Sequence, residues 1–561
     1  MVHADHTFDL RTSVVPFPPE LVARYRALDL WADTTIGEAF TAVAATCPDR
    51  AAVIDPVRQL TYRELDQRSD AVATGMLELG LVPGDRIILQ LTNRVETVEA
   101  WYGCLKAGVV PVCSLPIHGQ RDIESLIRTT GARAHLVDAE VRDGALLELA
   151  LDVRTRFGGL DFLITVGDDT GSADSTLAIL ASGPSSASAL GAAHERFGPD
   201  DLAILQLSGG TTAAPKAIPR LHAESWYNGL ATARRYPILA AERVAHVIPL
   251  IHNAGVHSAL HAGHSVGATV LTCSADPDEF IPFLREQKAD SVLLVPGMVS
   301  WLLEREDFRS LLTSLRRFSM SAAAVPPELF DELEQMGVTC VQQFGMGEGL
   351  CTGMSLDDSR AMRRDTVGYV LSEEDEARIV GPDGEDVPLG EPGELWVRGP
   401  YTIRGYWHDP ERNAVAFSSD GFYKTGDVMT AQEIDGRRCL VVGGRIKDLI
   451  NRGGEKINAE EVEEAIGRHP DIREVALVAM PDRRFGERGC AYVVPRQPLS
   501  PPSLAELTEF LRSLGLAKYK WPERVEIIER LPRTQVGKVE KAGLRELIAR
   551  KLEEEGDGAG S

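Results

Sequence analysis

Apolar, β-rich runs alternate with helical patterns along the first half of the chain, and no other feature restricts the fold as strongly. Between Ala51 and about Val270 the run AAVIDPV precedes YRELDQRSDAVATGMLELG, DRIILQL, ETVEAWYGCLKAG and VVPVC. The same rhythm returns in LAILQLS, ATVLTC and SVLLVP. Strands that alternate with amphipathic helices are typical of a parallel sheet covered by helices. We therefore expect an α/β fold.

The composition and the pattern of apolar residues change at three further places in the sequence. A Ser/Ala/Gly-rich segment between Asp169 and Gly198 predicts a surface connection. Short strands and turns after Gly390 predict a small antiparallel or barrel-like β subdomain, and a compact α+β pattern begins near Ile446. The predicted parts are a core over residues 1–445, a C-terminal domain over 446–552, and a disordered tail over 553–561 that should fray.

Charge and composition exclude several classes of protein. The net charge of -24 argues against binding to nucleic acid or to an anionic membrane, because both partners reward an excess of Lys and Arg. No apolar run approaches the ~18 residues of a membrane span, and the N-terminus lacks the apolar region of a signal peptide. The eight cysteines form no C-x-x-C pair, which predicts reduced thiols. We expect a cytoplasmic protein.

The run LQLSGGTTAAPKAIPR, from Leu205 to Arg220, combines glycines, hydroxyls and a lysine. Backbone N–H groups of such a turn can hold phosphate oxygens, with the hydroxyls and the lysine beside them. The run is not a Walker A loop, because G-x-x-x-x-G-K-[ST] is absent. Taken alone, it fits a solvated loop as well as a phosphate site.

Six motifs give this loop a context: SGGTTAAPK, the pair His252–Asn253, QQFGMGEG, YKTGD, GGRIKDLINRGGEK and LPRTQVGK. In order and spacing the chain resembles the ANL superfamily of adenylate-forming enzymes. LQLSGG with IPR-x-H, FGM-x-EGL, RGPYTIRGY and KDLINRGGEK resemble its stand-alone aryl-acid AMP ligases, which load 2,3-dihydroxybenzoate or salicylate onto carrier proteins. The resemblance implies a large N-terminal domain of two α/β sheet subdomains with a small β subdomain, and a small, mobile α+β C-terminal domain.

The resemblance assigns roles in binding ATP and Mg²⁺. Glu348 would hold the metal, which suits a hard carboxylate oxygen. Asp427 and Arg445 would bind the ribose. Lys538 would stabilise charge on the reacting carboxylate and α-phosphate, and His252 is a second catalytic candidate. The remaining ATP-binding candidates are Ser208, Gly209, Gly210, Thr211, Thr212 and Lys216 for the phosphates, and Gln343, Phe344, Gly345 and Met346 around adenine.

Other residues would serve the second half-reaction, in which relatives rotate the C-terminal domain. Lys447 and Asp448 occupy the hinge position. Gly453, Gly454 and Lys456 would line the tunnel for a phosphopantetheine thiol. A basic patch at Arg483, Arg484 and Arg488 is a candidate docking site for the carrier protein.

The acid pocket combines familiar and unusual residues. Asn253 implies an ortho-hydroxy or ortho-amino aryl acid, because relatives use this Asn to bind the ortho group. Ala254 stands where a Tyr is common, and Ala322 stands where relatives usually carry Gly. Ser258 and Cys351 complete the predicted lining. The phosphate loop departs too, with Ala213 at a usual Gly position, which would cost about 1 kcal/mol if the position needs a positive φ.

The sequence therefore predicts an ATP- and Mg²⁺-dependent ligase that makes an aryl-adenylate and acylates an aryl carrier protein, in siderophore or nonribosomal peptide biosynthesis. An aryl-CoA ligase that acylates free coenzyme A stays open as the alternative. Ala213 alone would support a non-catalytic homologue, and the retained Lys216, Glu348, Asp427 and Lys538 argue against one. Two rival patterns are weaker. GHSVG at 263–267 matches a hydrolase elbow but lies between a helix and a strand in the reverse order. His257, His261 and His264 share a helical face and could bind zinc.

Overall fold

The computed structural model describes residues 14–141, 143–167, 171–207, 216–323, 325–445, 448–452, 455–482, 485–497, 501–514, 516, 518–534 and 537–558. The chain divides into two compact units. The first contains Met1–Gly210, Ala214–Glu376 and Val397–Tyr423, and the second contains Thr211–Ala213, Ala377–Trp396 and Lys424–Ser561. The boundary that we placed between residues 445 and 446 stays a prediction.

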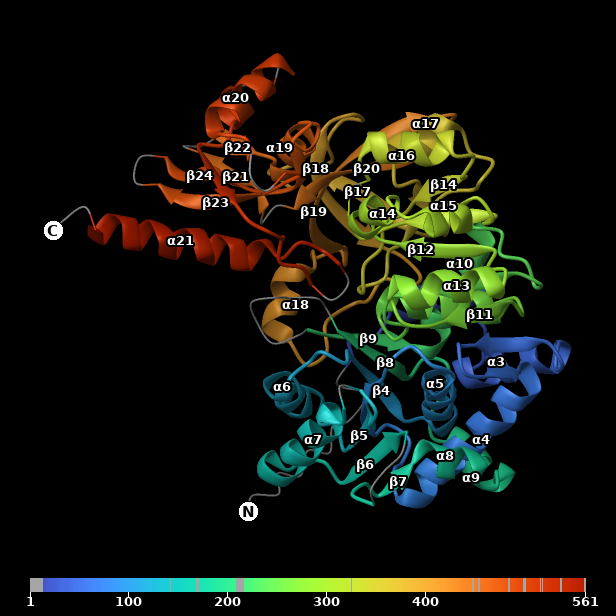
Figure 1. Ribbon diagram of the computed structural model, residues 1–561. Helices are drawn as coiled ribbons and strands as arrows, with labels where there is room; N and C mark the ends of the chain where they lie inside the picture. Colours follow the sequence, from blue (N-terminus) through green and yellow to red (C-terminus); the bar gives the residue numbers. More distant parts are fainter. Residues whose placement is uncertain are drawn as a thin grey trace. The chain divides into compact units, whose positions relative to one another are not determined.

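A seven-stranded sheet in the order β7-β6-β5-β3-β4-β8-β9 forms one half of the first unit (Figure 1). Its strands are β3 (Arg86–Gln90), β4 (Val110–Ser114), β5 (Ala134–Asp138), β6 (Phe162–Val166), β7 (Ser175–Thr176), β8 (Leu202–Leu207) and β9 (Ala217–Leu221). All neighbours pair in parallel except β8 and β9, which are antiparallel. The parallel sheet expected from the sequence is therefore present.

Helices cover both faces of this sheet because every position of its central strands is apolar or buried. Ile87 and Leu89 pack with α4 (Tyr62–Leu79) and α5 (Val95–Ala107), whereas Ile88 packs with α6 (Gln120–Thr130). Helix α7 (Ala145–Asp152) and the π-helical turn η1 (Val153–Phe157) lie on the α6 side. Local sequence sets the helix ends: Thr61 and Glu64 form a capping box at the start of α4.

The second seven-stranded sheet runs β14-β13-β12-β10-β11-β1-β2. Its strands are β1 (Ala51–Ile54), β2 (Gln59–Thr61), β10 (Arg243–His246), β11 (Thr269–Thr272), β12 (Ser291–Leu294), β13 (Arg317–Met320) and β14 (Cys340–Gln342). Only β2 is antiparallel to its neighbour. Val53 and Val270 share a core with α4 and α5, so these helices pack between the two sheets.

The two faces of the second sheet have separate helices. Phe318 and Met320 face α13 (Pro277–Glu286), α14 (Pro296–Leu302), α15 (Glu306–Leu312) and α16 (Pro327–Gln335). Val244 and Val341 face the end of α10 (His222–Arg235), the π-helical turn η2 (Val256–His261) and α12 (Ala262–Ser265). The shorter elements of the first unit are α2 (Pro19–Ala27), α3 (Ile36–Thr46), α11 (Asn253–Gly255), α17 (Arg360–Asp365), α18 (Pro410–Ala416) and the strands β15 (Thr352–Gly353) and β16 (Tyr369–Val370).

The second unit contains a five-stranded sheet of β21 (Ile450–Arg452), β22 (Glu455–Ile457), β23 (Ile472–Asp482), β24 (Gly486–Pro495) and β25 (Arg524–Ile527). Its helices are α19 (Ala459–Gly467), α20 (Leu504–Ser513), α21 (Lys541–Gly558) and the 3-10 turn η4 (Lys518–Lys520). A four-stranded sheet contains β17 (Glu376–Val380), β18 (Pro392–Arg398), β19 (Tyr423–Ile434) and β20 (Arg437–Arg445) in that order. Strands β19 and β20 pair antiparallel, as the short strands after Gly390 predicted.

One local expectation was wrong. The Ala-rich segment between Asp169 and Gly198 forms α8 (Leu177–Ser182) and α9 (Ala187–His194), because Leu177 and Leu180 are buried against α4 and α5. Helix α21 extends to Gly558, and the expectation that residues 553–561 fray stays a prediction. Among the described residues no helix combines the length and the apolar character needed to cross a bilayer.

Candidate active site

Glu348, the predicted metal ligand, lies in a network of hydroxyl groups. Its Oε1 accepts hydrogen bonds from Tyr406 over 2.6 Å and from Tyr423 over 3.1 Å. Both tyrosine hydroxyls have raised pKa values, mainly because of burial and then because of the charge on Glu348, so both stay protonated and donate. Oε2 receives no hydrogen bond within the described part of the chain, which leaves one carboxylate oxygen available to a cation.

Lys216 joins the same network. Its Nζ lies 3.4 Å from the Tyr406 hydroxyl and 4.9 Å from the centre of that ring. The structure therefore brings Lys216 and Glu348 together through one tyrosine. A cation and a carboxylate so arranged suit a phosphate oxygen and a divalent metal ion, respectively.

The backbone next to Glu348 leaves no room for a side chain at position 349, which is a glycine. Its φ is +133°, and a Cβ placed there would lie 1.9 Å from the carbonyl oxygen of Tyr401. The carbonyl of Glu348 accepts a hydrogen bond from the N–H of Ile403 over 2.8 Å. The loop after β14 therefore reaches the segment before Tyr406 closely enough to fix the position of Glu348.

Asn253, the predicted contact for the ortho group, is also held on both sides of its amide. Arg220 donates from Nη1 to Asn253 Oδ1 over 3.3 Å, and Asn253 Nδ2 donates to the carbonyl of Met346 over 3.0 Å. Arg220 is fully buried and forms a bidentate pair with Glu224, at 2.8 Å for each contact. Burial raises the pKa of Glu224, although the charge of Arg220 opposes that shift.

The three histidines that could have bound zinc use their ring nitrogens within the protein, so the zinc alternative was wrong. His257 contacts Ser225 Oγ and the Asn253 carbonyl, at 3.1 Å each. His261 pairs with Trp101 and the Ser225 carbonyl, and His264 pairs with Tyr102 and the Ala52 carbonyl. No cluster of three metal-binding side chains occurs in the described residues.

The GHSVG segment does not form a hydrolase elbow. Helix α12 ends at Ser265 and β11 follows it, which is the reverse of the required order. The Ser265 hydroxyl donates to the carbonyl of Ala262 over 2.9 Å. His252 lies before α11, where its Nδ1 accepts a weak hydrogen bond from the N–H of Ala254 over 3.4 Å.

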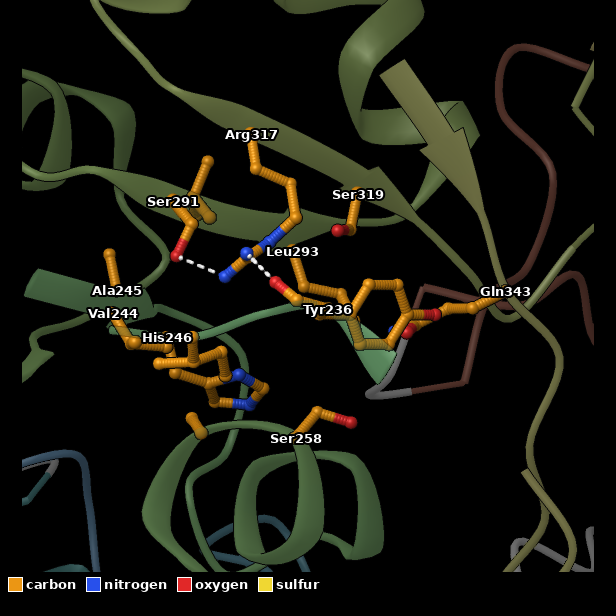
Figure 2. Close-up of a pocket in the computed structure, with 13 residues that line it drawn as sticks. Tyr236, Val244, Ala245, His246, Ser258, Ser291, Leu293, Arg317, Ser319 and Gln343 are labelled. Atoms are coloured by element: carbon orange, nitrogen blue, oxygen red, sulfur yellow. Dashed lines mark hydrogen bonds between the residues drawn. The ribbon is translucent and has the colours of Figure 1, made fainter. Parts of the chain in front are cut away.

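A cavity of about 30 Å³ lies between the second sheet and η2 (Figure 2). Alternate residues of a strand point to the same face of a sheet, and on the face that lines this cavity several of them are polar. Ser258 and Gln343, both predicted site residues, lie in the lining with Tyr236. The other polar side chains in the lining come from the sheet: His246 on β10, Ser291 on β12, and Arg317 and Ser319 on β13.

The hydrogen-bonding groups at the Arg317 side of the cavity are satisfied by one another. Arg317 donates to Glu242 over 2.6 Å, to Ser291 Oγ over 3.1 Å and to the Tyr236 carbonyl over 2.5 Å. Ser291 Oγ donates to the same carboxylate over 3.0 Å. This side of the cavity is therefore closed by a complete ion-pair network rather than by groups that need a ligand.

The other predicted pocket residues lie outside the lining of this cavity. Asn253, Ala254, Ala322 and Cys351 do not contribute to it. Ala322 has a φ of +75°, a left-handed backbone conformation that favours glycine. The thiol of Cys351 packs against the cluster around Tyr401, and burial raises its pKa to about 11.

The second unit contains the remaining described candidates. Asp427 on β19 pairs in register with Arg445 on β20, so the two predicted ribose ligands are opposite each other on neighbouring strands. Asp448 accepts a hydrogen bond from Arg545 over 2.8 Å. The backbone N–H of Lys538 donates to Thr534 Oγ1 over 3.2 Å in a short turn.

Several predicted residues lie outside the described residues. They are Ser208, Gly209, Gly210, Thr211, Thr212, Ala213, Lys447, Gly453, Gly454, Arg483 and Arg484. Only the backbone of Lys456 is described, within β22. Arg488 of the proposed docking patch pairs with Asp482 over 2.8 Å.

Sequence reasoning missed the residues that support these candidates. Tyr406 and Tyr423 occur in the quoted motifs RGPYTIRGY and YKTGD, but sequence spacing does not show that both reach Glu348. A pattern in the sequence could have identified the polar residues that line the cavity. In RFSM, Arg317 and Ser319 alternate with Phe318 and Met320, which marks a polar face on a buried strand.

Comparisons with known proteins agree along nearly the whole chain. Residues 40–407 match the family described as AMP-binding enzyme, and residues 461–538 match the AMP-binding enzyme C-terminal domain. Pyochelin synthase PchD of Pseudomonas aeruginosa is 39% identical, over 96% of this chain and 96% of that protein. The 2,3-dihydroxybenzoate-AMP ligase of Bacillus subtilis is 37% identical, over 96% of this chain and 98% of that protein. The apo structure of Mycobacterium smegmatis MbtA matches with a TM-score of 0.72 and 34% identity, over 96% of this chain and 99% of that one, which confirms the expected fold class.

Proposed function

The chain belongs to the AMP-binding enzyme family, and on that premise we propose that it activates an ortho-hydroxy or ortho-amino aryl acid with ATP and transfers the aryl group to a carrier protein. It is an adenylate-forming ligase, as the sequence resemblance implied. The relatives named for pyochelin synthesis and for 2,3-dihydroxybenzoate activation support siderophore or nonribosomal peptide biosynthesis as its setting.

The hydrogen bonds of Asn253 are the observation that supports an ortho-substituted acid as the substrate. Arg220 occupies one side of Oδ1, and the carbonyl of Met346 takes one N–H of Nδ2. An amide nitrogen has two N–H groups, so one donor remains for the oxygen of an ortho-hydroxyl. The second lone pair of Oδ1 could accept from an ortho-amino group, so the same side chain serves both acids.

The first half-reaction needs a carboxylate oxygen to attack the α-phosphorus of ATP, which forms a P–O bond while the bond to pyrophosphate breaks. Lys216 would neutralise phosphate oxygens, and Lys538 would stabilise charge that grows on the α-phosphate and the carboxylate. Glu348 would hold Mg²⁺ through Oε2, while Tyr406 and Tyr423 fix Oε1. When bound, this metal ion would neutralise charge on the phosphates.

In the second half-reaction the sulfur of a phosphopantetheine thiol attacks the acyl carbon, a thioester forms, AMP leaves, and the thiol proton passes to solvent. We propose a carrier protein as the donor of that thiol. Gly453, Gly454 and Lys456 are the proposed lining of its tunnel, and Lys447 with Asp448 the proposed hinge. The patch at Arg483, Arg484 and Arg488 is the proposed docking site.

Acid-dependent exchange of pyrophosphate into ATP tests the proposal. The panel comprises salicylate, 2,3-dihydroxybenzoate, anthranilate, 3-hydroxyanthranilate and hydroxypicolinate, with benzoate as the control that lacks an ortho group. We expect exchange with an ortho-substituted acid to exceed that with benzoate by about tenfold or more, and Asn253→Ala to remove most of that preference. Exchange that is equal for benzoate, or absent for every acid, would reject it.

Transfer then separates the two candidate thiols. The adenylate formed with the preferred acid is offered to a phosphopantetheinylated aryl carrier protein and, separately, to coenzyme A. Faster acylation of the carrier protein is the expected result. Faster acylation of free coenzyme A would make the chain an aryl-CoA ligase.

A further inference from the structure

A carboxylate on β18 supports the backbone next to Asp427, the predicted ribose ligand. Glu394 lies on β18 and Asp427 on β19, and the two strands are neighbours in the four-stranded sheet (Figure 1). Glu394 Oε1 accepts a hydrogen bond over 3.0 Å from the N–H of Gly426, the residue before Asp427. A carboxylate binds a backbone N–H more strongly than a neutral carbonyl does, so this contact is a firm link between the strands.

The second oxygen of Glu394 is held as well. Trp396 follows Glu394 by two residues, on the same face of β18, and its indole N–H donates to Glu394 Oε2 over 2.8 Å. The amino group of Lys424 lies 5.0 Å from the centre of the Trp396 ring, a cation–π contact that joins this ring to the start of β19. Both oxygens of the carboxylate therefore have a defined partner, and its orientation is fixed.

Gly426 is the point at which β19 can bend. Its φ is +73°, whereas residues of a regular strand have negative φ values, so the chain turns just before Asp427. A Cβ at position 426 would meet no atom of the described residues within 4 Å, so glycine is needed there for its conformation and not for space. Glycine adopts positive and negative φ values about equally well, and therefore its own structure does not select this turn.

Two hydrogen bonds select the turn instead. The N–H of Asp427 donates to Thr425 Oγ1 over 3.0 Å, and the N–H of Gly426 donates to Glu394. The first bond is local and moves with the turn, whereas the second connects the turn to the neighbouring strand. Asp427 is 5% exposed, so a rotation at Gly426 would change the direction of a carboxylate that has little room to adjust.

We propose that Glu394 is a positioning residue for Asp427, because it selects the turn at Gly426 in which the Asp427 carboxylate meets the ribose hydroxyls of ATP. The proposal deepens the proposed function and rests on it, since it requires ATP to bind with its ribose at Asp427. Glu394 acts through the backbone and not on the substrate. Its loss weakens the recognition of the ribose hydroxyls, whereas the loss of a merely structural contact would weaken the binding of every nucleotide alike.

The experiment compares ATP with 2′-deoxy-ATP and 3′-deoxy-ATP. Calorimetry in the presence of Mg²⁺ and without an acid gives the Kd of each nucleotide, and pyrophosphate exchange gives the kcat/KM. Glu394→Ala removes the acceptor, and Glu394→Gln keeps one oxygen for the N–H of Gly426. Asp427→Ala, alone and combined with Glu394→Ala, completes a double-mutant cycle.

Glu523→Ala is the matched control within the same unit. Glu523 also accepts from the N–H of a glycine, Gly489, over 3.4 Å, and its other oxygen accepts from a side chain, Arg452, over 2.7 Å. Thermal unfolding checks that each variant folds.

We expect the wild type to bind ATP about tenfold more tightly than either deoxynucleotide. Glu394→Ala should remove most of that preference, Glu394→Gln should keep part of it, and Glu523→Ala should keep all of it. Once Asp427 is replaced by Ala, Glu394→Ala should cause no further loss of preference, because the residue that it positions is gone.

Equal weakening of all three nucleotides by Glu394→Ala, or independent effects of the two changes in the cycle, would overturn the inference alone. A preference for ATP that survives Asp427→Ala would overturn it too, since Asp427 would then not bind the ribose. A wild type that distinguishes the nucleotides but exchanges pyrophosphate with no acid would overturn the proposed function, and the nucleotide Kd values would still decide the role of Glu394.

Discussion

Arg220 donates a hydrogen bond to Asn253 over 3.3 Å and so fixes which end of the Asn253 amide is the oxygen. With Oδ1 on the guanidinium and Nδ2 on the Met346 carbonyl, a reversed amide would place N–H against a cation and oxygen against oxygen. Arg220 also donates to the carbonyls of Gly347 and Tyr401, at 3.2 and 3.3 Å. One buried side chain thus connects the strand after the phosphate loop to two loops of the site.

Replacing Arg220 by Leu should destabilise the protein by about 3–5 kcal/mol, because Glu224 would remain buried without its partner. The double variant Arg220→Leu with Glu224→Leu should recover most of that loss, since no buried charge is left. Urea unfolding of the wild type and both variants measures the difference. We expect the double variant to fold yet to lose the preference for ortho-substituted acids in pyrophosphate exchange. A single variant as stable as the wild type would contradict this account.

Glu348→Gln should lower pyrophosphate exchange by about 100-fold and raise the Mg²⁺ concentration needed for half-maximal rate. The amide keeps an oxygen that can accept from Tyr406 and Tyr423, but the negative charge proposed to hold the metal ion is gone. Exchange is measured across a Mg²⁺ titration. Glu332→Gln on α16 is the control, because this carboxylate pairs with Arg309 and is not part of the hydroxyl network around Glu348. An unchanged Mg²⁺ dependence would remove Glu348 as the metal ligand.

Lys538→Ala should slow adenylation by about 100-fold or more while transfer from a supplied aryl-adenylate to the carrier thiol changes much less. The reason is that charge grows on the α-phosphate only in the first half-reaction. Single-turnover assays follow the two steps separately. Lys520→Ala, which breaks a surface ion pair with Glu461 in the same unit, should change neither step. Equal loss of both steps would reject the role of Lys538.

Ala322→Gly should raise the free energy of unfolding by about 0.5–1 kcal/mol. An Ala at a φ of +75° is strained, and Gly removes that strain at the cost of a more flexible unfolded chain. The neighbouring Ala323, which is exposed and has no positive φ, provides the control, and Ala323→Gly should lower stability slightly. Urea unfolding measures the free energy of unfolding of both variants. Equal destabilisation by both changes would show that position 322 is not strained.

Asp375 should make the protein less stable as pH rises between about 4 and 7. Burial raises the pKa of this carboxyl to about 7, from an ordinary value of 3.8, although hydrogen bonds from Tyr401 and Ser372 oppose the shift. In that window the folded protein keeps a proton that the unfolded chain has lost, so the free energy of unfolding falls with increasing pH. The loss should be about 3–4 kcal/mol.

Asp375→Asn should remove this contribution. The free energy of unfolding of the variant minus that of the wild type should therefore increase from pH 5 to pH 8. Urea unfolding at both pH values measures it. The other titrating groups are common to both proteins and cancel in the comparison. A difference that stays constant with pH would show that Asp375 keeps an ordinary pKa.

Much of the site could be predicted from the sequence because its residues lie in short motifs. The alternation of strands and helices predicted the parallel sheets, and SGGTTAAPK, FGMGEGL and YKTGD named Lys216, Glu348 and Asp427 as candidates. The same reasoning misjudged the segment between Asp169 and Gly198, because its leucines were too few to give a clear helical period. It left zinc as a weaker alternative for His257, His261 and His264, since a shared helical face does not reveal that every ring already has protein partners.

The sequence by itself determined the order of strands and helices, the helix caps and the motif residues, because those depend on local periodicity and on neighbours a few positions apart. Only the tertiary structure decided that Tyr406 and Tyr423 hold Glu348, that Arg220 orients Asn253, and that His246 lines a cavity. Those relationships join residues from separate strands and loops, and the packing of the sheets against the helices sets their distances.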